Sequence, residues 1–199
     1  MRRELAFLAL FLLLVSCNLF AGSGKDCKPD LSAARPEKIE DIEGVAAGNL
    51  YLDGRVYIAG QPDEAALAEL VGRGVAVVVN TRTPKEVEDR EKVPFDEESA
   101  VRNLGISYVA IPLGGEDHPY EPAAVEQFAE VLSTSDGPVL IHCGYGGRAA
   151  YLWLAYLIEY EKLPLEDAMA RGEAMMLKPH PVGRLLDRPT KLVFVAEPE

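Results

Sequence analysis

Positively charged residues are scarce in this chain of 199 residues. Lysine and arginine together number 20, against 32 aspartates and glutamates, and the formal net charge is −12. No run of lysines or arginines interrupts this acidic background. Because nucleic acids and anionic lipid headgroups attract basic surfaces, the composition excludes both as direct partners. The hydrophobic content of 48% is typical of a globular protein.

Histidine is also rare, and the three histidines lie far apart in the sequence, at positions 118, 142 and 180. Their separation does not match the spacing of metal-binding motifs. We therefore expect no metal ion, and no motif in the chain indicates a cofactor.

Long hydrophobic runs are missing except at the N-terminus. Leu5 to Val15 form an unbroken apolar segment of eleven residues behind Arg2 and Arg3. This segment is too short to span a bilayer and has the form of a secretory signal. Its last residues and the cysteine after them, Leu14-Val15-Ser16-Cys17, resemble the lipobox of bacterial lipoproteins. The alternative is an ordinary signal peptide that happens to contain a cysteine.

The lipobox resemblance implies that residues 1–16 are a lipoprotein signal peptide and that a lipid is attached to Cys17. The protein would then be exported and anchored at the bacterial cell membrane or its periplasmic face, with the lipid as its membrane contact. Residues 17–38 are rich in glycine, serine and proline, and we predict a flexible tether there.

Cysteine is limited to three residues, Cys17, Cys27 and Cys143. If Cys17 is acylated, Cys27 and Cys143 remain as thiols. An exported protein meets oxidising conditions, so a disulfide between these two is one possibility. The other is that Cys143 is kept as a reactive thiol, which its neighbours in the sequence favour.

Strand and helix patterns alternate after the tether. Asp53-Gly54 between two apolar segments predicts a hairpin, and the apolar run Val75–Val79 predicts a central strand. Residues 81–98 are polar and contain two prolines, so we expect a surface connection. Further strands are predicted over 106–113 and 138–141, and helices after Asp63 and over 97–104, 122–132, 149–158 and 164–170.

This alternation predicts one doubly wound α/β domain over residues 39–179, followed by a C-terminal extension over 180–199. Helices should flank a central, mostly parallel sheet. Such folds bind ligands at the carboxyl ends of their strands. Cys143 and Asp117 both follow predicted strands, so we expect them at the same edge of the sheet.

The stretch from Pro138 to Ala150 carries the strongest functional signal. A short buried strand ends at a thiol, and three glycines and an arginine separate this thiol from an apolar helix. A helix N-terminus has unpaired N–H groups and the positive end of the helix dipole, which together favour an anion. The same field favours a thiolate at Cys143, and the guanidinium of Arg148 suits an oxyanion.

His142-Cys143, the glycines and Arg148 resemble the signature loop of cysteine-dependent phosphatases of the tyrosine and dual-specificity class. Three other segments match a bacterial branch of that superfamily, some members of which are fused to beta-lactamase-like hydrolases. These segments are Ala59-Gly60-Gln61-Pro62, Val78-Val79-Asn80-Thr81-Arg82 with Glu86, and Ile111-Pro112-Leu113. The resemblance implies the phosphatase fold, a phosphate ester or phosphoprotein substrate and a phosphocysteine intermediate.

The resemblance also implies roles for individual residues. Cys143 would be the nucleophile, and Arg148 would hold the substrate oxygens together with the loop residues Gly144, Tyr145, Gly146 and Gly147. Asp117 is the first candidate for the general acid that protonates the leaving oxygen, and Glu116 is the second. His142 is expected to be buried and to fix the loop by hydrogen bonds.

Two differences from the usual signature leave other chemistry open. The spacing is Cys-x4-Arg where these phosphatases usually have Cys-x5-Arg, and Ala149 replaces the usual serine or threonine after the arginine. A loop of this length is also typical of rhodanese-type sulfurtransferases, whose cysteine carries a persulfide. A third possibility is an inactive module that only binds anions.

Overall fold

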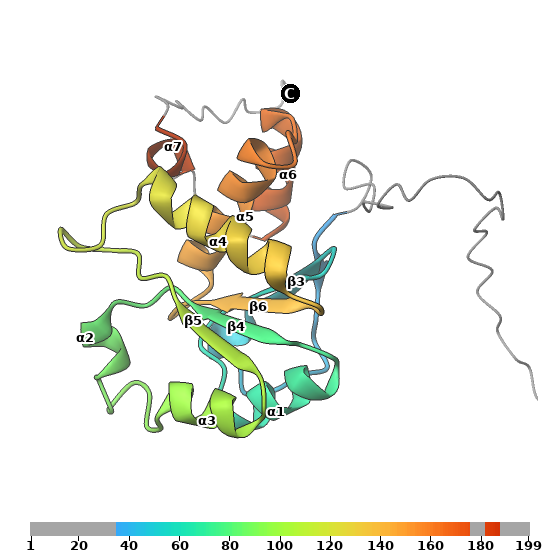
Figure 1. The fold of residues 1–199 in the computed structure, drawn as a ribbon. Helices are drawn as coiled ribbons and strands as arrows, with labels where there is room; N and C mark the ends of the chain where they lie inside the picture. Colours follow the sequence, from blue (N-terminus) through green and yellow to red (C-terminus); the bar gives the residue numbers. More distant parts are fainter. Residues whose placement is uncertain (1–34, 176–181, 188–199) are drawn as a thin grey trace, which may run out of the picture.

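A mixed six-stranded sheet forms the centre of the structure, a computed structural model that describes residues 35–175 and 182–187. The strand order is β1-β2-β3-β6-β4-β5. Figure 1 labels β3, β6, β4 and β5 in the middle of the molecule. β3, β6, β4 and β5 run parallel to one another, whereas β1, β2 and β3 are antiparallel. The strands are β1 (Glu37–Lys38), β2 (Leu50–Asp53), β3 (Val56–Ala59), β4 (Val77–Asn80), β5 (Ser107–Ala110) and β6 (Val139–His142).

The parallel strands end in register at one edge of the sheet. His142, the last residue of β6, pairs with Ala59 on one side and with Asn80 on the other. Asn80 in turn pairs with Ala110 at the end of β5. The segments after these strands therefore leave the sheet side by side, at the edge where the sequence predicts the site.

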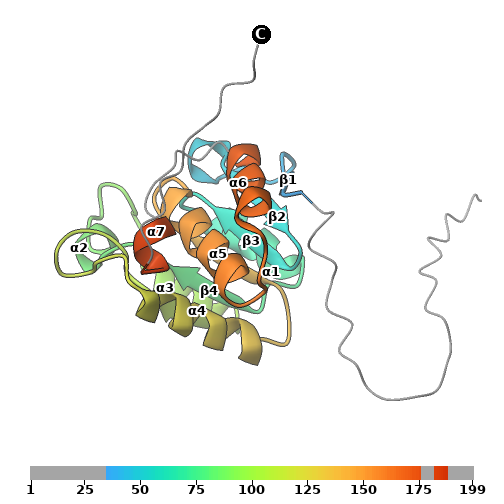
Figure 2. The same ribbon diagram turned by 90° about the horizontal axis from the view of Figure 1, so that it is seen from above.

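Helices cover both faces of the sheet, as the α/β prediction requires. Figure 1 shows α1 and α3 on one face and α4, α5, α6 and α7 on the other, and in Figure 2 α5 lies among α4, α6 and α7. The bounds are α1 (Glu64–Gly72), α2 (Pro84–Val87), α3 (Glu97–Asn103), α4 (Pro122–Thr134), α5 (Gly147–Glu159), α6 (Leu165–Ala174) and α7 (Val182–Leu185), with a short 3-10 turn at Ala46–Gly48.

Alternate residues of the central strands face two separate cores. In β6, Val139 and Ile141 pack against the layer of α4 and α5, whereas Leu140 packs against the layer of α1 and α3. β4 alternates in the same way, with Val79 facing the first core and Val78 the second. This period of two along fully buried strands explains why each strand is a continuous apolar run in the sequence.

A buried ion pair joins helices α5 and α6 to the hairpin of β2 and β3. The carboxylate of Asp53 accepts hydrogen bonds from the guanidinium of Arg171 in α6 and, at 2.9 Å, from the indole N–H of Trp153 in α5. All three side chains are almost completely buried. Asp53 is the last residue of β2 and not part of the turn, so the turn predicted at Asp53-Gly54 lies one residue further along, at Gly54-Arg55.

The predicted surface connection over 81–98 is wrong in part, because it contains α2. Thr83 and Glu86 form a capping box, in which Glu86 accepts hydrogen bonds from the Thr83 backbone and hydroxyl, and Pro84 occupies the first helical position. Glu97, predicted to begin a short helix, does begin α3, but its side chain is only 2% exposed.

Packed elements also lie beyond the predicted domain range of 39–179. β1 falls within the segment predicted as the tether, and α7 falls within the predicted C-terminal extension. Val182 and Leu185 of α7 are buried against α4 and α5. The predicted signal peptide, Cys17 and Cys27 lie outside the described residues. Within the described ranges every helix is too short or too polar to cross a bilayer.

Candidate active site

The catalytic loop, which we define as residues 143–148, connects the end of β6 to the start of α5. Cys143 is 3% exposed, and its Sγ accepts a hydrogen bond of 3.1 Å from the backbone N–H of Gly146. Gly146 has a φ of +94°, and a Cβ there would approach the Ala59 carbonyl carbon to 3.4 Å. Gly146 can therefore turn its N–H toward the sulfur in a backbone conformation that would strain a residue with a side chain.

Backbone and amide contacts from the β2–β3 side hold this loop in place. The Cys143 N–H donates to the Ala59 carbonyl at 3.3 Å, and the Gln61 N–H donates to the Gly144 carbonyl at 3.2 Å. The side chain of Asn49 donates to the Tyr145 carbonyl at 2.9 Å. Gln61, in one of the segments that carry the family resemblance, thus borders the catalytic loop.

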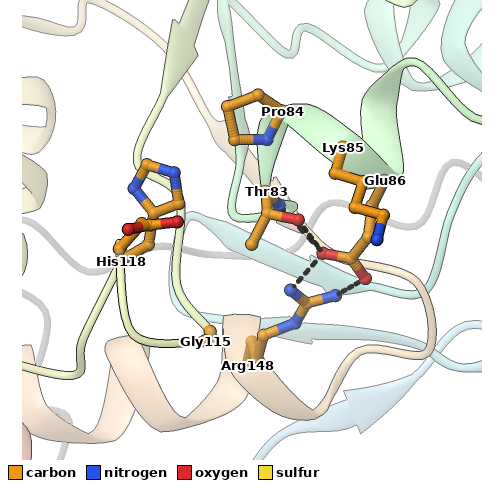
Figure 3. A pocket seen from close by; sticks show the side chains of 9 residues that line it. Thr83, Pro84, Lys85, Glu86, Gly115, His118 and Arg148 are labelled. Carbon is orange, nitrogen blue, oxygen red and sulfur yellow. Dashed lines mark hydrogen bonds and ion pairs between the residues drawn. The ribbon is translucent and has the colours of Figure 1, made fainter.

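Arg148 lies in the first turn of α5 and is paired with Glu86 of α2. Its two terminal nitrogens each lie 2.7 Å from a different Glu86 oxygen, and one of them also donates to the Leu113 carbonyl at 2.8 Å (Figure 3). Hydrogen bonds from Arg148 lower the pKa of Glu86 to about 2, against the opposing effect of its burial. Burial disfavours the charge of Arg148, yet Glu86 and Cys143 together raise its pKa.

A cavity of about 580 Å³ opens beside this pair. In Figure 3, His118 lies across from Thr83 and Glu86, and the guanidinium of Arg148 points toward Glu86. Asp117 also lines this cavity, and Glu116 is not among its lining residues. The structure therefore brings Asp117 and Arg148 to one pocket, and the choice between Asp117 and Glu116 as the acid stays a prediction. The lining residues are Thr83, Pro84, Lys85, Glu86, Gly114, Gly115, Asp117, His118 and Arg148.

Tyr120, which the sequence did not indicate, follows the loop of Asp117 and packs partly buried against the core of α4 and α5. Burial is the main cause of its raised pKa, and the charges of Arg148 and Cys143 also act on it. Tyr145 of the catalytic loop, in contrast, is 77% exposed. Its backbone is part of the catalytic loop, but its side chain is exposed to solvent.

His142 is completely buried, as predicted, but it does not hold the loop through aligned ring hydrogen bonds. Its Nε2 lies 3.2 Å from a Glu97 oxygen, at an angle too poor for a hydrogen bond. Burial lowers the pKa of His142, which favours the neutral ring. The His142 carbonyl makes the firm contacts, accepting from the backbone N–H and the hydroxyl of Thr81, each at 2.9 Å.

Residues 35–175 and 182–187 contain no group of three or more His, Cys, Asp or Glu side chains placed to hold a metal ion. Cys143 is the one cysteine in these ranges, so its proposed pairing with Cys27 stays a prediction.

Comparison with known families matches this site. The model of the phosphatase-like domain of beta-lactamase hydrolase-like proteins matches residues 51–156, from the hairpin to the middle of α5. The chain belongs to this family. The match includes the catalytic loop, α2 and the loop of Asp117, and it confirms the resemblance seen in the sequence motifs.

The relatives found by sequence are longer proteins. A beta-lactamase hydrolase-like protein from Xylella fastidiosa (strain Temecula1) is 28% identical over 120 residues, which cover 60% of this chain and 27% of that protein. One from Agrobacterium fabrum is 32% identical over 100 residues, which cover 50% of this chain and 22% of that protein. The chain thus spans about a quarter of the length of the curated relatives it matches.

Solved structures confirm the predicted fold class. A candidate phosphatase from Shewanella putrefaciens CN-32 has a TM-score of 0.55 and 26% identity, over 73% of this chain and 91% of that one. P. aeruginosa TpbA has a TM-score of 0.53 and 20% identity, over 69% of this chain and 77% of that one. The α/β sheet flanked by helices is therefore the phosphatase fold.

Proposed function

We propose that this protein is a cysteine-dependent phosphatase that hydrolyses a phosphate ester or phosphoprotein through a phosphocysteine intermediate. The observation that carries the proposal is the catalytic loop, where the Cys143 sulfur accepts a hydrogen bond from the Gly146 N–H at the start of α5 and Glu86 fixes Arg148 in the same loop. Family membership supports it, and one solved relative of the same fold, TpbA, is known in complex with phosphotyrosine.

The reaction follows from the groups present. The Cys143 thiolate attacks phosphorus while the bond from phosphorus to the ester oxygen breaks, and Asp117 gives its proton to that oxygen. The loop N–H groups and the Arg148 guanidinium bear the charge of the phosphoryl oxygens in the transition state. Water then attacks the phosphocysteine, the Asp117 carboxylate takes the water proton, and the thiolate leaves as inorganic phosphate forms.

Sulfur transfer is the second candidate, and Ala149 is the observation that favours it. Ala149, the residue after Arg148, is fully buried. Related phosphatases usually have a serine or threonine at this position, whose hydroxyl supports the departing thiolate. The Cys-x4-Arg spacing makes the catalytic loop one residue shorter than in most related phosphatases, and a shorter loop would leave less room for a phosphate group. Both features slow the breakdown of a phosphocysteine without hindering a persulfide.

One set of assays separates the candidates. The purified protein and its Cys143→Ser variant are tested for phosphate release from an aryl phosphate and for sulfur transfer from thiosulfate. Phosphate release by the native protein alone supports the phosphatase. Sulfur transfer without phosphate release would replace it with the second candidate, and thermal protection by phosphate without either activity would indicate an anion-binding module.

We also propose that the protein acts outside the cytoplasm, anchored through a lipid on Cys17. The signal-like segment and the lipobox-like Leu14-Val15-Ser16-Cys17 support this location. Fractionation of cells that express the native protein or Cys17→Ala tests it. The native protein should partition with membranes and the variant should not, and a membrane-bound variant would contradict lipidation.

A further inference from the structure

A buried polar network lies behind the catalytic loop, and the reaction as described does not use it. Its centre is Glu97, the first residue of α3, whose side chain is 2% exposed. One carboxylate oxygen accepts a hydrogen bond of 2.7 Å from Gln61 Nε2, and the other accepts one of 2.6 Å from Asn80 Nδ2. Removing a carboxylate from water carries a large desolvation cost, which these donors offset.

Two short connections lead from Glu97 to the catalytic loop. The backbone N–H of Gln61 donates to the Gly144 carbonyl, so the same residue contacts both Glu97 and the loop. Glu97 also lies 3.2 Å from the ring of His142, the residue before Cys143. The carboxylate thus lies against His142, the residue before the thiol, and is linked through Gln61 to Gly144, the residue after it.

A third connection leads from Glu97 to the arginine of the site. The side-chain oxygen of Gln61 accepts a hydrogen bond of 2.6 Å from Arg82, which is 4% exposed. Arg82 in turn donates to the backbone carbonyl of Glu86, whose carboxylate holds Arg148. Glu97 is therefore linked, through Gln61 and Arg82, both to the backbone of the catalytic loop and to the side chain of Arg148.

We propose that Glu97 is a positioning residue that fixes the catalytic loop and Arg148 in the geometry that binds an oxyanion. The inference rests on the proposed function only in taking this loop as the oxyanion site. An ionised carboxylate accepts hydrogen bonds and donates none, which fits its N–H neighbours. A glutamine of the same shape would turn an amide N–H toward Asn80 or Gln61, and the network would have to rearrange.

The test compares Glu97→Gln with Glu98→Gln. Glu98 is the next residue of α3, but its exposed side chain pairs only with Arg102 on the surface. Binding of tungstate, a non-hydrolysable oxyanion, is measured by calorimetry, and alkylation of Cys143 is followed against pH. We expect Glu97→Gln to bind tungstate about tenfold more weakly, the effect of losing one well-aimed hydrogen bond, and Glu98→Gln to match the native protein.

The alkylation profile distinguishes positioning from a simple charge effect. Loss of the aligned N–H groups shifts the midpoint of alkylation to higher pH, whereas removal of a nearby negative charge alone shifts it to lower pH. Unchanged tungstate affinity, or a shift to lower pH, would overturn the inference. A merely structural Glu97 would lower the melting temperature and leave both readouts unchanged in the folded protein.

A second variant decides the matter if Glu97→Gln does not fold. Gln61→Met keeps the length of the side chain and removes its hydrogen bonds to Glu97 and Arg82, so it should weaken tungstate binding in the same direction. Native tungstate affinity in folded Gln61→Met would contradict the inference. Tungstate binding needs no turnover, so a native protein that binds tungstate but releases no phosphate contradicts the proposed function alone.

Discussion

Replacing Glu86 by glutamine tests the pairing that holds Arg148 in the site. The hydrogen bonds from Arg148 lower the pKa of Glu86 from 4.5 to about 2, so the ionised carboxylate stabilises the folded state. The full shift would correspond to roughly 3 kcal/mol. Because the Glu86 side chain is 36% exposed, solvent screening reduces the expected contribution to about 1–2 kcal/mol.

The pH dependence of this contribution has a defined direction. The folded-state pKa is lower than the unfolded value, so the stabilisation is complete above pH 4.5 and disappears as the pH falls toward about 2. We expect the native protein to exceed Glu86→Gln in unfolding free energy by about 1–2 kcal/mol near pH 7, with the gap closing in acid.

Urea unfolding of the two proteins across this pH range measures the gap. Glu88→Gln, an exposed carboxylate just after the same short helix, is the control and should match the native protein at each pH. The glutamine variant should also bind tungstate about tenfold more weakly, because Arg148 loses its bidentate partner. Equal stability near pH 7, or a gap that does not change with pH, would show that the Glu86–Arg148 pair does not stabilise the fold.

Three further predictions follow from individual side chains. In steady-state assays, Asp117→Asn should lower kcat for aryl phosphates about a hundredfold, with the largest loss for poor leaving groups, because the general acid is removed. Glu116→Gln should have little effect, and a larger loss in Glu116→Gln than in Asp117→Asn would make Glu116 the acid. Gly146→Ala and Gly74→Ala both place a side chain at positive φ, but only Gly146 lies in the catalytic loop and donates its N–H to Cys143. Only Gly146→Ala should therefore strongly weaken tungstate binding in calorimetry, and equal affinities of the two variants would contradict this. Asp53→Ala removes the carboxylate from a buried ion pair and should lower the unfolding free energy in urea by about 3–5 kcal/mol, whereas a loss below about 1 kcal/mol would show that the pair contributes little.

The sequence predicted most of the fold because the strands and helices have strong local signals. The apolar run Val75–Val79 predicted a central buried strand, and β4 forms there over Val77–Asn80. Asp63 caps α1 by accepting a hydrogen bond from the Ala66 N–H, as expected. The missed helix α2 had a signal, since Thr83 followed three residues later by Glu86 is a capping box. The polarity of its surroundings concealed that signal.

The site was predicted only as far as its residues lie in one contiguous loop. Cys143 and Arg148 share a loop, and their chemistry follows from residue type and spacing. The partners of this loop come from distant segments, and a glutamate on a polar stretch usually faces solvent. Only the folded chain shows that Glu86 pairs with Arg148 and that Glu97 is buried behind His142.

The proposed phosphatase mechanism requires that Cys143 carries the phosphoryl group during the reaction. The measurement is a rapid acid quench of the protein with an aryl phosphate, followed by mass spectrometry of the peptide that contains Cys143. A phosphocysteine mechanism predicts one phosphoryl group on this cysteine and none in Cys143→Ser. Phosphate release without a label on Cys143, or with the label on another residue, would contradict it.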